Sequence, residues 1–269
     1  MTHKFFLLAL FITVLSCSSN SSSKSETQIN PITFEDFKEE ISNINFETGI
    51  NDIVLGGNVL GEPSYLGLDW RFRVIMPDVD FNNNNRPLVL NLHDHSSDDE
   101  THTTTWCFTE PGFENLDPII LSPYGGFITW PDPENQVRIL ALFEVLCIYL
   151  PIYTDKILVV GSGHGGIGAW YYAETRPDIF SAGIPLNCTY NLFSEGSNAR
   201  LIETPIYTLF SENDTVNPLV DIQNWIDASV TIGSDITLEL IDIPELQICK
   251  FESILRMNVS DWLVNHVWD

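Results

Sequence analysis

The residues with the clearest chemical meaning form the glycine-dense turn Gly161-Ser162-Gly163-His164-Gly165, which follows an apolar stretch and precedes a run of small residues. In a strand–turn–helix unit of this kind, the tip of the turn presents a nucleophile, normally the serine of Gly-x-Ser-x-Gly. Gly161 and Gly165 fill the two glycine positions, and Gly163 stands where the serine is expected. Glycine has no side chain with which to attack. It also relieves a backbone conformation that costs other residues about 1–3 kcal/mol.

Ser162 is the one hydroxyl within this turn, but it is out of register. The residues two positions away from it are Val160 and His164, where the pattern requires glycines. We therefore expect the turn to direct the Ser162 side chain away from the exposed tip.

Short apolar runs alternate with helical stretches along most of the chain, and this order predicts how the turn is held. Apolar runs of four to eight residues are typical of strands buried on both faces of a parallel sheet. We expect strands at 53–59, 70–76, 88–92, 119–121, 157–160, 182–186, 206–210 and 236–243. We expect helices at 33–44, 133–150 (capped by Asp132), 165–174, 218–228 and 253–266. The predicted fold class is α/β, with a doubly wound, mostly parallel sheet.

The charge balance is strongly acidic. The chain has 269 residues with 12 Lys+Arg against 37 Asp+Glu, which gives a net charge of −25. Such a chain does not bind a phosphate backbone, because nucleic-acid affinity depends on Lys and Arg. Solubility in an extracellular setting and the binding of a divalent cation are the two interpretations of the acidity.

The N-terminus has the pattern of an export signal. Lys4 precedes the apolar run 5–15, which is too short to span a bilayer. Val14-Leu15-Ser16-Cys17 resembles a bacterial lipobox, so we expect a signal peptide at 1–16, lipidation of Cys17, a flexible tether at 17–30 and one domain at 31–269. The predicted location is the bacterial cell envelope, on the periplasmic face or cell surface, with a plainly secreted protein as the alternative.

Four further cysteines are open to pairing in an oxidising compartment, and four allow three connectivities. Cys147 lies in an apolar run and is expected to be a buried free thiol. Cys188 and Cys249 both follow predicted strands, so a bridge between them is one possibility, and the pairing of Cys107 stays open.

A family resemblance rests on five motifs in fixed order: Arg86-Pro87-Leu88-Val89-Leu90-Asn91-Leu92-His93, Trp130-Pro131-Asp132-Pro133-Glu134-Asn135, Gly165-Gly166-Ile167-Gly168-Ala169, Glu212-Asn213-Asp214-Thr215-Val216 and Asp261-Trp262-Leu263. From about residue 70 to 266 the chain resembles single-domain α/β-hydrolases of the secreted esterase and predicted-peptidase type, relatives of polyhydroxybutyrate depolymerase-like and feruloyl-esterase-like enzymes. The resemblance implies an α/β-hydrolase fold and a Ser-His-Asp site.

The residues at the implied catalytic positions depart from that site. The acid position is Asp214, although an Asn-Asp pair also forms turns without a catalytic role. The base position falls near Gln247, and no histidine occurs between His164 and His266. Glutamine cannot accept and return a proton near neutral pH.

The oxyanion loop is altered as well. The family usually has His-Gly after this strand, and here the residues are His93 and Asp94, with His164 after the elbow. A carboxylate ~6 Å from a developing oxyanion opposes it by roughly 2–3 kcal/mol at an effective dielectric near 20. Catalysis needs donors or positive charge at this point.

A metal site is the remaining chemical possibility. Four histidines are expected near the carboxyl edge of the sheet, with acidic neighbours that suit zinc or a similar ion: His93, His95, His102 and His164, with Asp94, Asp98, Asp99, Glu100 and Asp214. The alternative is a solvated polar loop in which His93 packs structurally.

These observations favour an exported, lipid-anchored, non-catalytic protein of α/β-hydrolase fold without a cofactor. It is expected to contact the membrane through Cys17 and to bind a small molecule, glycan or peptide in the old substrate cleft. The alternative is an active, divergent ester or peptide hydrolase that uses a rewired or metal-assisted His/Asp site.

Overall fold

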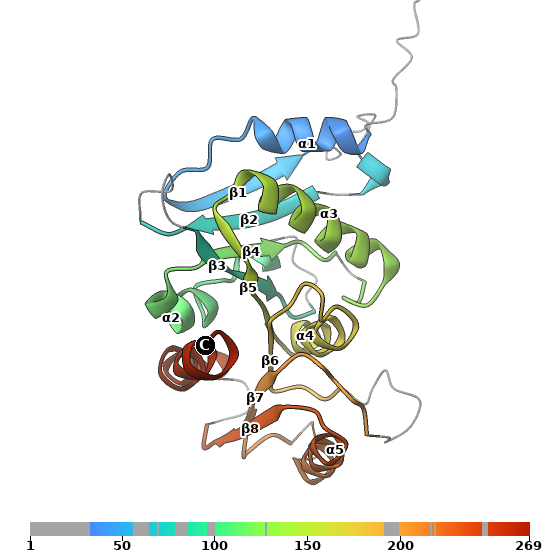
Figure 1. Cartoon of the computed structure of the whole chain (residues 1–269), viewed down its shortest axis with the longest axis vertical. Helices are drawn as coiled ribbons and strands as arrows, with labels where there is room; N and C mark the ends of the chain where they lie inside the picture. The colour runs from blue at the N-terminus through green and yellow to red at the C-terminus, as the bar shows by residue number, and fades with distance from the viewer. Residues whose placement is uncertain are drawn as a thin grey trace, which may run out of the picture. The chain divides into compact units, whose positions relative to one another are not determined.

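An eight-stranded sheet carries the fold, with strand order β1-β2-β4-β3-β5-β6-β7-β8 (Figure 1). The strands are β1 (Gly49–Leu55), β2 (Trp70–Met76), β3 (Arg86–Leu92), β4 (Ile119–Pro123), β5 (Ile152–Ser162), β6 (Ala182–Leu186), β7 (Ile206–Ser211) and β8 (Ile236–Ile241). β1 and β2 pair antiparallel, β2 also meets β4 antiparallel, and the remaining pairs are parallel. The predicted doubly wound, mostly parallel sheet is confirmed.

The computed structural model describes residues 33–55, 65–68, 70–78, 85–95, 100–126, 128–190, 199–215, 217, 219–243 and 247–269. Within it, Pro31–Asp269 form one compact unit. The predicted signal peptide and tether, with Cys17, lie outside the described residues, as do Asp98 and Asp99. No helix in the described ranges is both long and apolar enough to cross a membrane.

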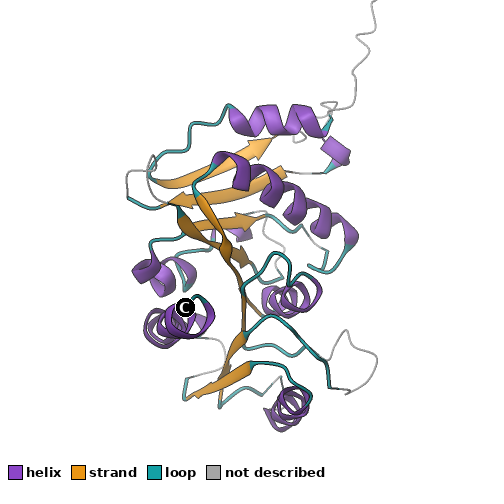
Figure 2. Ribbon diagram, viewed as in Figure 1, coloured by secondary structure: helices purple, strands orange, loops and turns teal. Residues whose placement is uncertain are grey.

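Helices cover both faces of the sheet (Figure 2). One face carries α1 (Phe34–Ser42), α3 (Pro133–Tyr149), α4 (His164–Thr175) and α5 (Leu219–Thr231). The other carries α2 (Thr109–Phe113) and the C-terminal helical segment, which runs from Glu252 to Val267 through α6 (Glu252–Ile254), a π-helical stretch, α7 (Ser260–Trp262) and a second π-helical stretch.

The apolar runs form the two cores because alternate residues of a strand point to opposite faces. In β3, Leu88 and Leu90 belong to the buried cluster that includes residues of α1 and α3, whereas Val89 belongs to the cluster that includes residues of α2 and the C-terminal segment. Every residue of β4, β6 and β7 is buried, as expected for strands covered on both faces.

Helix ends follow the sequence closely, with one difference in chemistry. Thr33 caps α1 through a capping box with Asp36. Asp132 stands at the N-cap of α3, as predicted, but its side chain forms no cap bond. Its carboxylate instead accepts hydrogen bonds from the backbone N–H and hydroxyl of Thr129, both at 2.7 Å.

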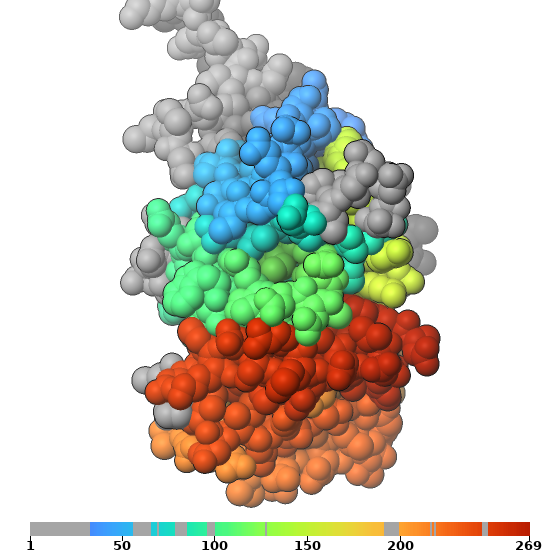
Figure 3. All heavy atoms as spheres, turned by 90° about the vertical axis from the view of Figure 1, so that its left-hand side faces the viewer, coloured from blue at the N-terminus to red at the C-terminus, as the bar shows by residue number. Residues whose placement is uncertain are grey.

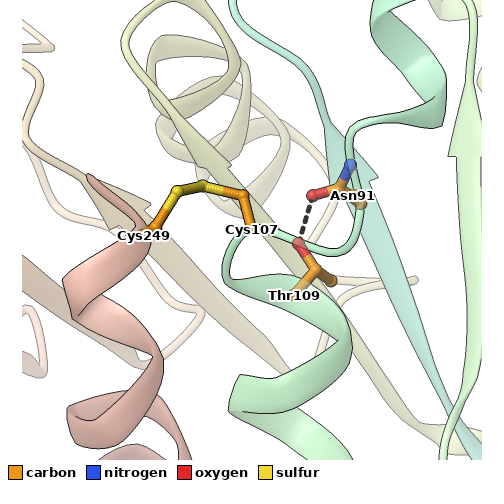
Figure 4. Close-up of a disulfide and its surroundings, with 4 residues drawn as sticks. All are labelled: Asn91, Cys107, Thr109 and Cys249. Carbon is orange, nitrogen blue, oxygen red and sulfur yellow. Dashed lines mark hydrogen bonds between the residues drawn. A yellow bond between two sulfur atoms is a disulfide. The ribbon is translucent and has the colours of Figure 1, made fainter. Parts of the chain in front are cut away.

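The cysteine pairing differs from the suggested one. Cys107 and Cys249 form a disulfide with a Cα–Cα distance of 4.7 Å, so the suggested Cys188–Cys249 bridge is wrong (Figure 4). Cys188 is a buried free thiol, and Cys147 is a free thiol that is half-buried. The error arose because the segment around Cys107 has no long helical or strand pattern, so this cysteine could not be placed beforehand.

Candidate functional site

The predicted strand–turn–helix unit surrounds Gly163. β5 ends at Ser162, α4 begins at His164, and Gly163 between them has φ 53° and ψ −120°. A residue other than glycine rarely adopts this backbone conformation without strain. The tip of the elbow is therefore a sharp turn at a residue without a side chain.

The flanking glycines allow β3, β5 and α4 to approach closely. A Cβ atom on Gly165 would lie 1.9 Å from the carbonyl oxygen of Leu92, and one on Gly161 would lie 2.4 Å from the carbonyl carbon of Gly165. Real Cβ atoms do not approach backbone atoms this closely, so both positions require glycine. The same close packing brings the residues after β3 to the tip of the elbow.

Asp94, two residues after β3, fills the space in front of that tip. A Cβ atom on Gly163 would lie 2.5 Å from its Oδ1, 2.6 Å from its Oδ2 and 2.7 Å from its Cγ. The first atom of a nucleophilic side chain at position 163 would thus overlap the carboxylate. The space that a catalytic serine would occupy already holds another side chain.

The same carboxylate accepts hydrogen bonds from two backbone N–H groups that suit a substrate oxyanion. His164 donates its N–H to Asp94 Oδ1 at 2.8 Å, and His95 donates its N–H to the same oxygen at 2.7 Å. In an active elbow the oxyanion donors are the N–H after the nucleophile and an N–H from the loop after β3. The estimate of a carboxylate ~6 Å from these groups therefore needs correction, because Asp94 Oδ1 is hydrogen-bonded directly to both N–H groups.

The surroundings favour a negative charge in this position. The carboxylate lies at the N-terminus of α4, a helix of 12 residues, where the helix dipole stabilises an anion. The His164 ring adds a polar neighbour, with Nδ1 3.4 Å from Asp94 Oδ1. The Asp94 carboxylate thus occupies the position, between these two N–H groups, that an oxyanion takes in an active elbow.

The four candidate metal ligands do not come together. The His95 and His164 rings are neighbours, with centroids 5.0 Å apart. His102 is buried elsewhere, edge-on to Tyr124, and its Nδ1 has no hydrogen-bond partner among the described residues. Burial lowers the pKa of His102 to about 4. In the described ranges, no three His, Cys, Asp or Glu side chains are arranged to hold a metal ion.

His93 has a structural position. Its Nδ1 lies 2.7 Å from the Asp94 carbonyl oxygen, and its Nε2 lies 2.9 Å from the N–H of Gly125, which donates to it. Burial lowers the pKa of His93, which favours the neutral ring that these two bonds require. The ring also meets Trp130 edge-on, and the Trp130 indole N–H donates to the His93 carbonyl at 2.9 Å.

Asp214, at the acid position, belongs to a local turn after β7. Its Oδ1 accepts the backbone N–H of Asn217 at 2.8 Å, and its Oδ2 accepts the Asn217 side-chain amide at 2.9 Å. These bonds satisfy the carboxylate just before α5 begins.

Gln247, at the base position, is exposed and precedes a short 3₁₀ helix (Ile248–Phe251). The next residue, Ile248, lines a cavity of about 90 Å³ together with Asp94 and Ser162. The loop expected to carry the base therefore borders the elbow but supplies no histidine. His266, in the C-terminal segment, contacts Asp235, which precedes β8: His266 Nε2 lies 2.7 Å from Asp235 Oδ2.

Ser162 and Cys188 are the hydroxyl and the thiol that lie near the elbow, and both are buried. Ser162 is only 3% exposed and lines the small cavity together with Asp94. Cys188 packs under α4, where a Cβ on Gly166 would lie 2.3 Å from its sulfur. Burial raises the pKa of the Cys188 thiol, which disfavours the reactive thiolate.

Sequence reasoning missed the segment that closes one side of the site. Thr101, Thr104, Cys107 and Phe108 line the small cavity. Long-range connections that hold this segment include the disulfide to Cys249 and a 2.6 Å bond from the Thr109 hydroxyl to the Asn91 side-chain oxygen on β3 (Figure 4). Neither connection has a local pattern, apart from the presence of the two cysteines.

The sequence matches no protein-family model and no curated protein. The structure, however, is similar to solved hydrolases. These include the S-formylglutathione hydrolase FrmB from Staphylococcus aureus (16% identity, TM-score 0.61, 81% of this chain and 100% of that chain). Est1E from Butyrivibrio proteoclasticus (13%, TM-score 0.58, 80% and 99%) and a ferulic acid esterase (14%, TM-score 0.57, 78% and 96%) are also similar. The chain therefore has the α/β-hydrolase fold.

Proposed function

We propose that this chain is a non-catalytic protein of α/β-hydrolase fold, exported, held at the membrane by a lipid on Cys17, and active as a binding protein. The observation that carries the proposal is the position of Asp94. Its carboxylate bonds both oxyanion donors and fills the space of a nucleophile at position 163.

The magnitudes support this proposal. A substrate oxygen that enters the hole has to displace hydrogen bonds to a charged group, which are worth about 1.5–3 kcal/mol. Loss of a single oxyanion donor already slows catalysis by about 10²–10³. Here both donors are engaged, and the positions that would supply a nucleophile and a base hold Gly163 and Gln247.

The test is hydrolysis of p-nitrophenyl acetate by purified protein, with heat-denatured protein as the control. We expect equal rates. Saturable turnover well above that control contradicts the non-catalytic role. If the turnover also disappears with chelator and returns with one equivalent of zinc, the alternative of a metal-assisted hydrolase replaces it.

The membrane location has a separate test. Cell fractionation is expected to place the native chain with membranes and the Cys17→Ser chain in the soluble fraction. Recovery of both chains in the same fraction contradicts a lipid anchor on Cys17, whatever the result of the esterase assay.

A further inference from the structure

A second, larger cavity is lined by both half-cystines of the disulfide. It measures about 590 Å³, within the range of roughly 300–1,000 Å³ that is usual for small-ligand sites. It opens beyond the carboxyl end of β8, the side of the sheet on which open α/β folds bind ligands. Cys107 lines both this cavity and the 90 Å³ cavity beside Asp94. Figure 3 faces the side where the segment around 100–120 (green) meets the C-terminal segment (orange to red).

Trp106 lines this larger cavity and is unusually exposed. Of the seven tryptophans, four are buried and two are half-buried, whereas Trp106 exposes 66% of its surface. An exposed large aromatic side chain at a pocket is a frequent anchor for a ligand, because binding removes its apolar surface from water.

The cavity wall is pre-organised around Trp106. The next residue, Cys107, is crosslinked to Cys249, and both half-cystines line the cavity. A wall whose backbone is fixed before binding loses little conformational entropy when the ligand arrives. Further apolar surface of the cavity comes from Ile241, Ile243 and Ile254.

The polar groups of the cavity indicate an uncharged ligand. Lys250, Glu252 and Ser253 supply donors and acceptors, and the one positive charge is matched by one negative charge. The net charge of −25 repels anions. A ligand with a flat apolar face for Trp106 and a rim of neutral groups that both donate and accept hydrogen bonds fits this arrangement.

We propose that this cavity, which we call the Trp106 cavity, binds a neutral sugar ring stacked on Trp106, with its hydroxyl groups bonded to Lys250, Glu252 and Ser253. The proposal names a ligand class for the binding role proposed above. It does not depend on the absence of catalysis, because the Trp106 cavity lies apart from Gly163.

The experiment is a titration of the intact, oxidised protein with cellohexaose, xylohexaose, mannohexaose and chitohexaose, followed by tryptophan fluorescence and calorimetry. At least one of these oligosaccharides is expected to bind saturably with a Kd of about 1 mM or below. Trp106→Ala is expected to weaken that binding about tenfold or more, as for other aromatic anchors. Trp106→Phe keeps a ring and is expected to retain most of it.

Two controls separate the Trp106 cavity from nonspecific effects. Tyr149→Ala removes another exposed aromatic ring, which does not line the cavity, and is expected to leave binding unchanged. Hexagalacturonate tests the charge argument and is expected to bind more weakly than the neutral sugars. The proposal is overturned if none of the four neutral sugars binds up to about 10 mM, if Trp106→Ala binds as the native chain does, or if indole binds the cavity and the sugars do not. Each of these results stands whether or not the protein hydrolyses p-nitrophenyl acetate.

Discussion

Replacing Gly163 by alanine tests the central feature of the site, because the added methyl group would contact the Asp94 carboxylate. The new Cβ would lie within 2.7 Å of three atoms of that carboxylate. The backbone there, with φ 53° and ψ −120°, also disfavours a side chain. A single methyl group is therefore expected to lower the free energy of unfolding for two separate reasons.

Each cost has an approximate size. Backbone strain accounts for about 1–3 kcal/mol. Pushing the carboxylate away from the N–H groups of His95 and His164 costs about 1.5–3 kcal/mol, and the lower end applies because the Asp94 side chain is 53% exposed and water replaces part of the loss. We expect Gly163→Ala to lower the free energy of unfolding by about 3 kcal/mol, which corresponds to a fall in Tm of roughly 6–12 °C.

The assay is a double-mutant cycle followed by urea unfolding. In the Asp94→Ala background the carboxylate is absent, so Gly163→Ala is expected to cost only the backbone strain. The coupling between the two changes is expected to be about 1.5 kcal/mol or more. Gly126→Ala is a matched control, since Gly126 has φ 67° but a Cβ there would meet nothing within 4 Å.

A coupling energy near zero would refute the reasoning, because it would mean that the Asp94 carboxylate does not occupy the elbow in solution. A Gly163→Ala cost equal to that of Gly126→Ala would lead to the same conclusion.

Three further predictions concern the disulfide, a buried histidine and position 163. Replacing Cys107 and Cys249 by serine releases a crosslink across 142 residues and should lower stability by about 2–5 kcal/mol; unfolding identical to the oxidised native chain would contradict this. Burial lowers the pKa of His102 to about 4 in the folded chain. As pH falls, His102 is therefore protonated in the unfolded chain before it is protonated in the folded chain. The free energy of unfolding should therefore fall as pH drops from about 6.5 to about 4, by at most ~1.4 kcal/mol per pH unit. Unfolding measured across this pH range should show a flatter slope for His102→Gln. An unaltered slope would assign the pH dependence to other groups. Gly163→Ser is expected to form no acyl-enzyme with p-nitrophenyl acetate, and a mass increase of one acetyl group on that residue would show that a base is present after all.

The sheet and the larger helices could be predicted because their signals are local. The residues of β3 pack alternately on two faces, and this follows directly from an apolar run between helical stretches. α3 and α4 were predicted to within a residue or so for the same reason. The turns at 101–116 have no such periodicity, because long-range contacts such as the bond from Thr109 to Asn91 hold them in place.

The candidate site also has a part that local sequence predicts and a part that long-range contacts determine. The elbow at Gly163 could be located from its glycines, since their necessity comes from sterics within one strand–turn–helix unit. The position of Asp94 could not, because it depends on contact between residues 70 positions apart, such as Asp94 and His164. Sequence reasoning identified a carboxylate whose negative charge opposes an oxyanion, and the structure adds that this carboxylate accepts hydrogen bonds from the N–H groups of His95 and His164.

The Cys107–Cys249 disulfide also changes how the chain responds to a protease. The loop that it closes contains β4 through β8, and thus most of the parallel sheet. A single cut anywhere between the two cysteines leaves both pieces covalently joined. Such a nicked molecule migrates at full length in a gel without reductant and separates into fragments only after reduction. In an oxidising compartment, cleavage of this protein therefore does not release its C-terminal half.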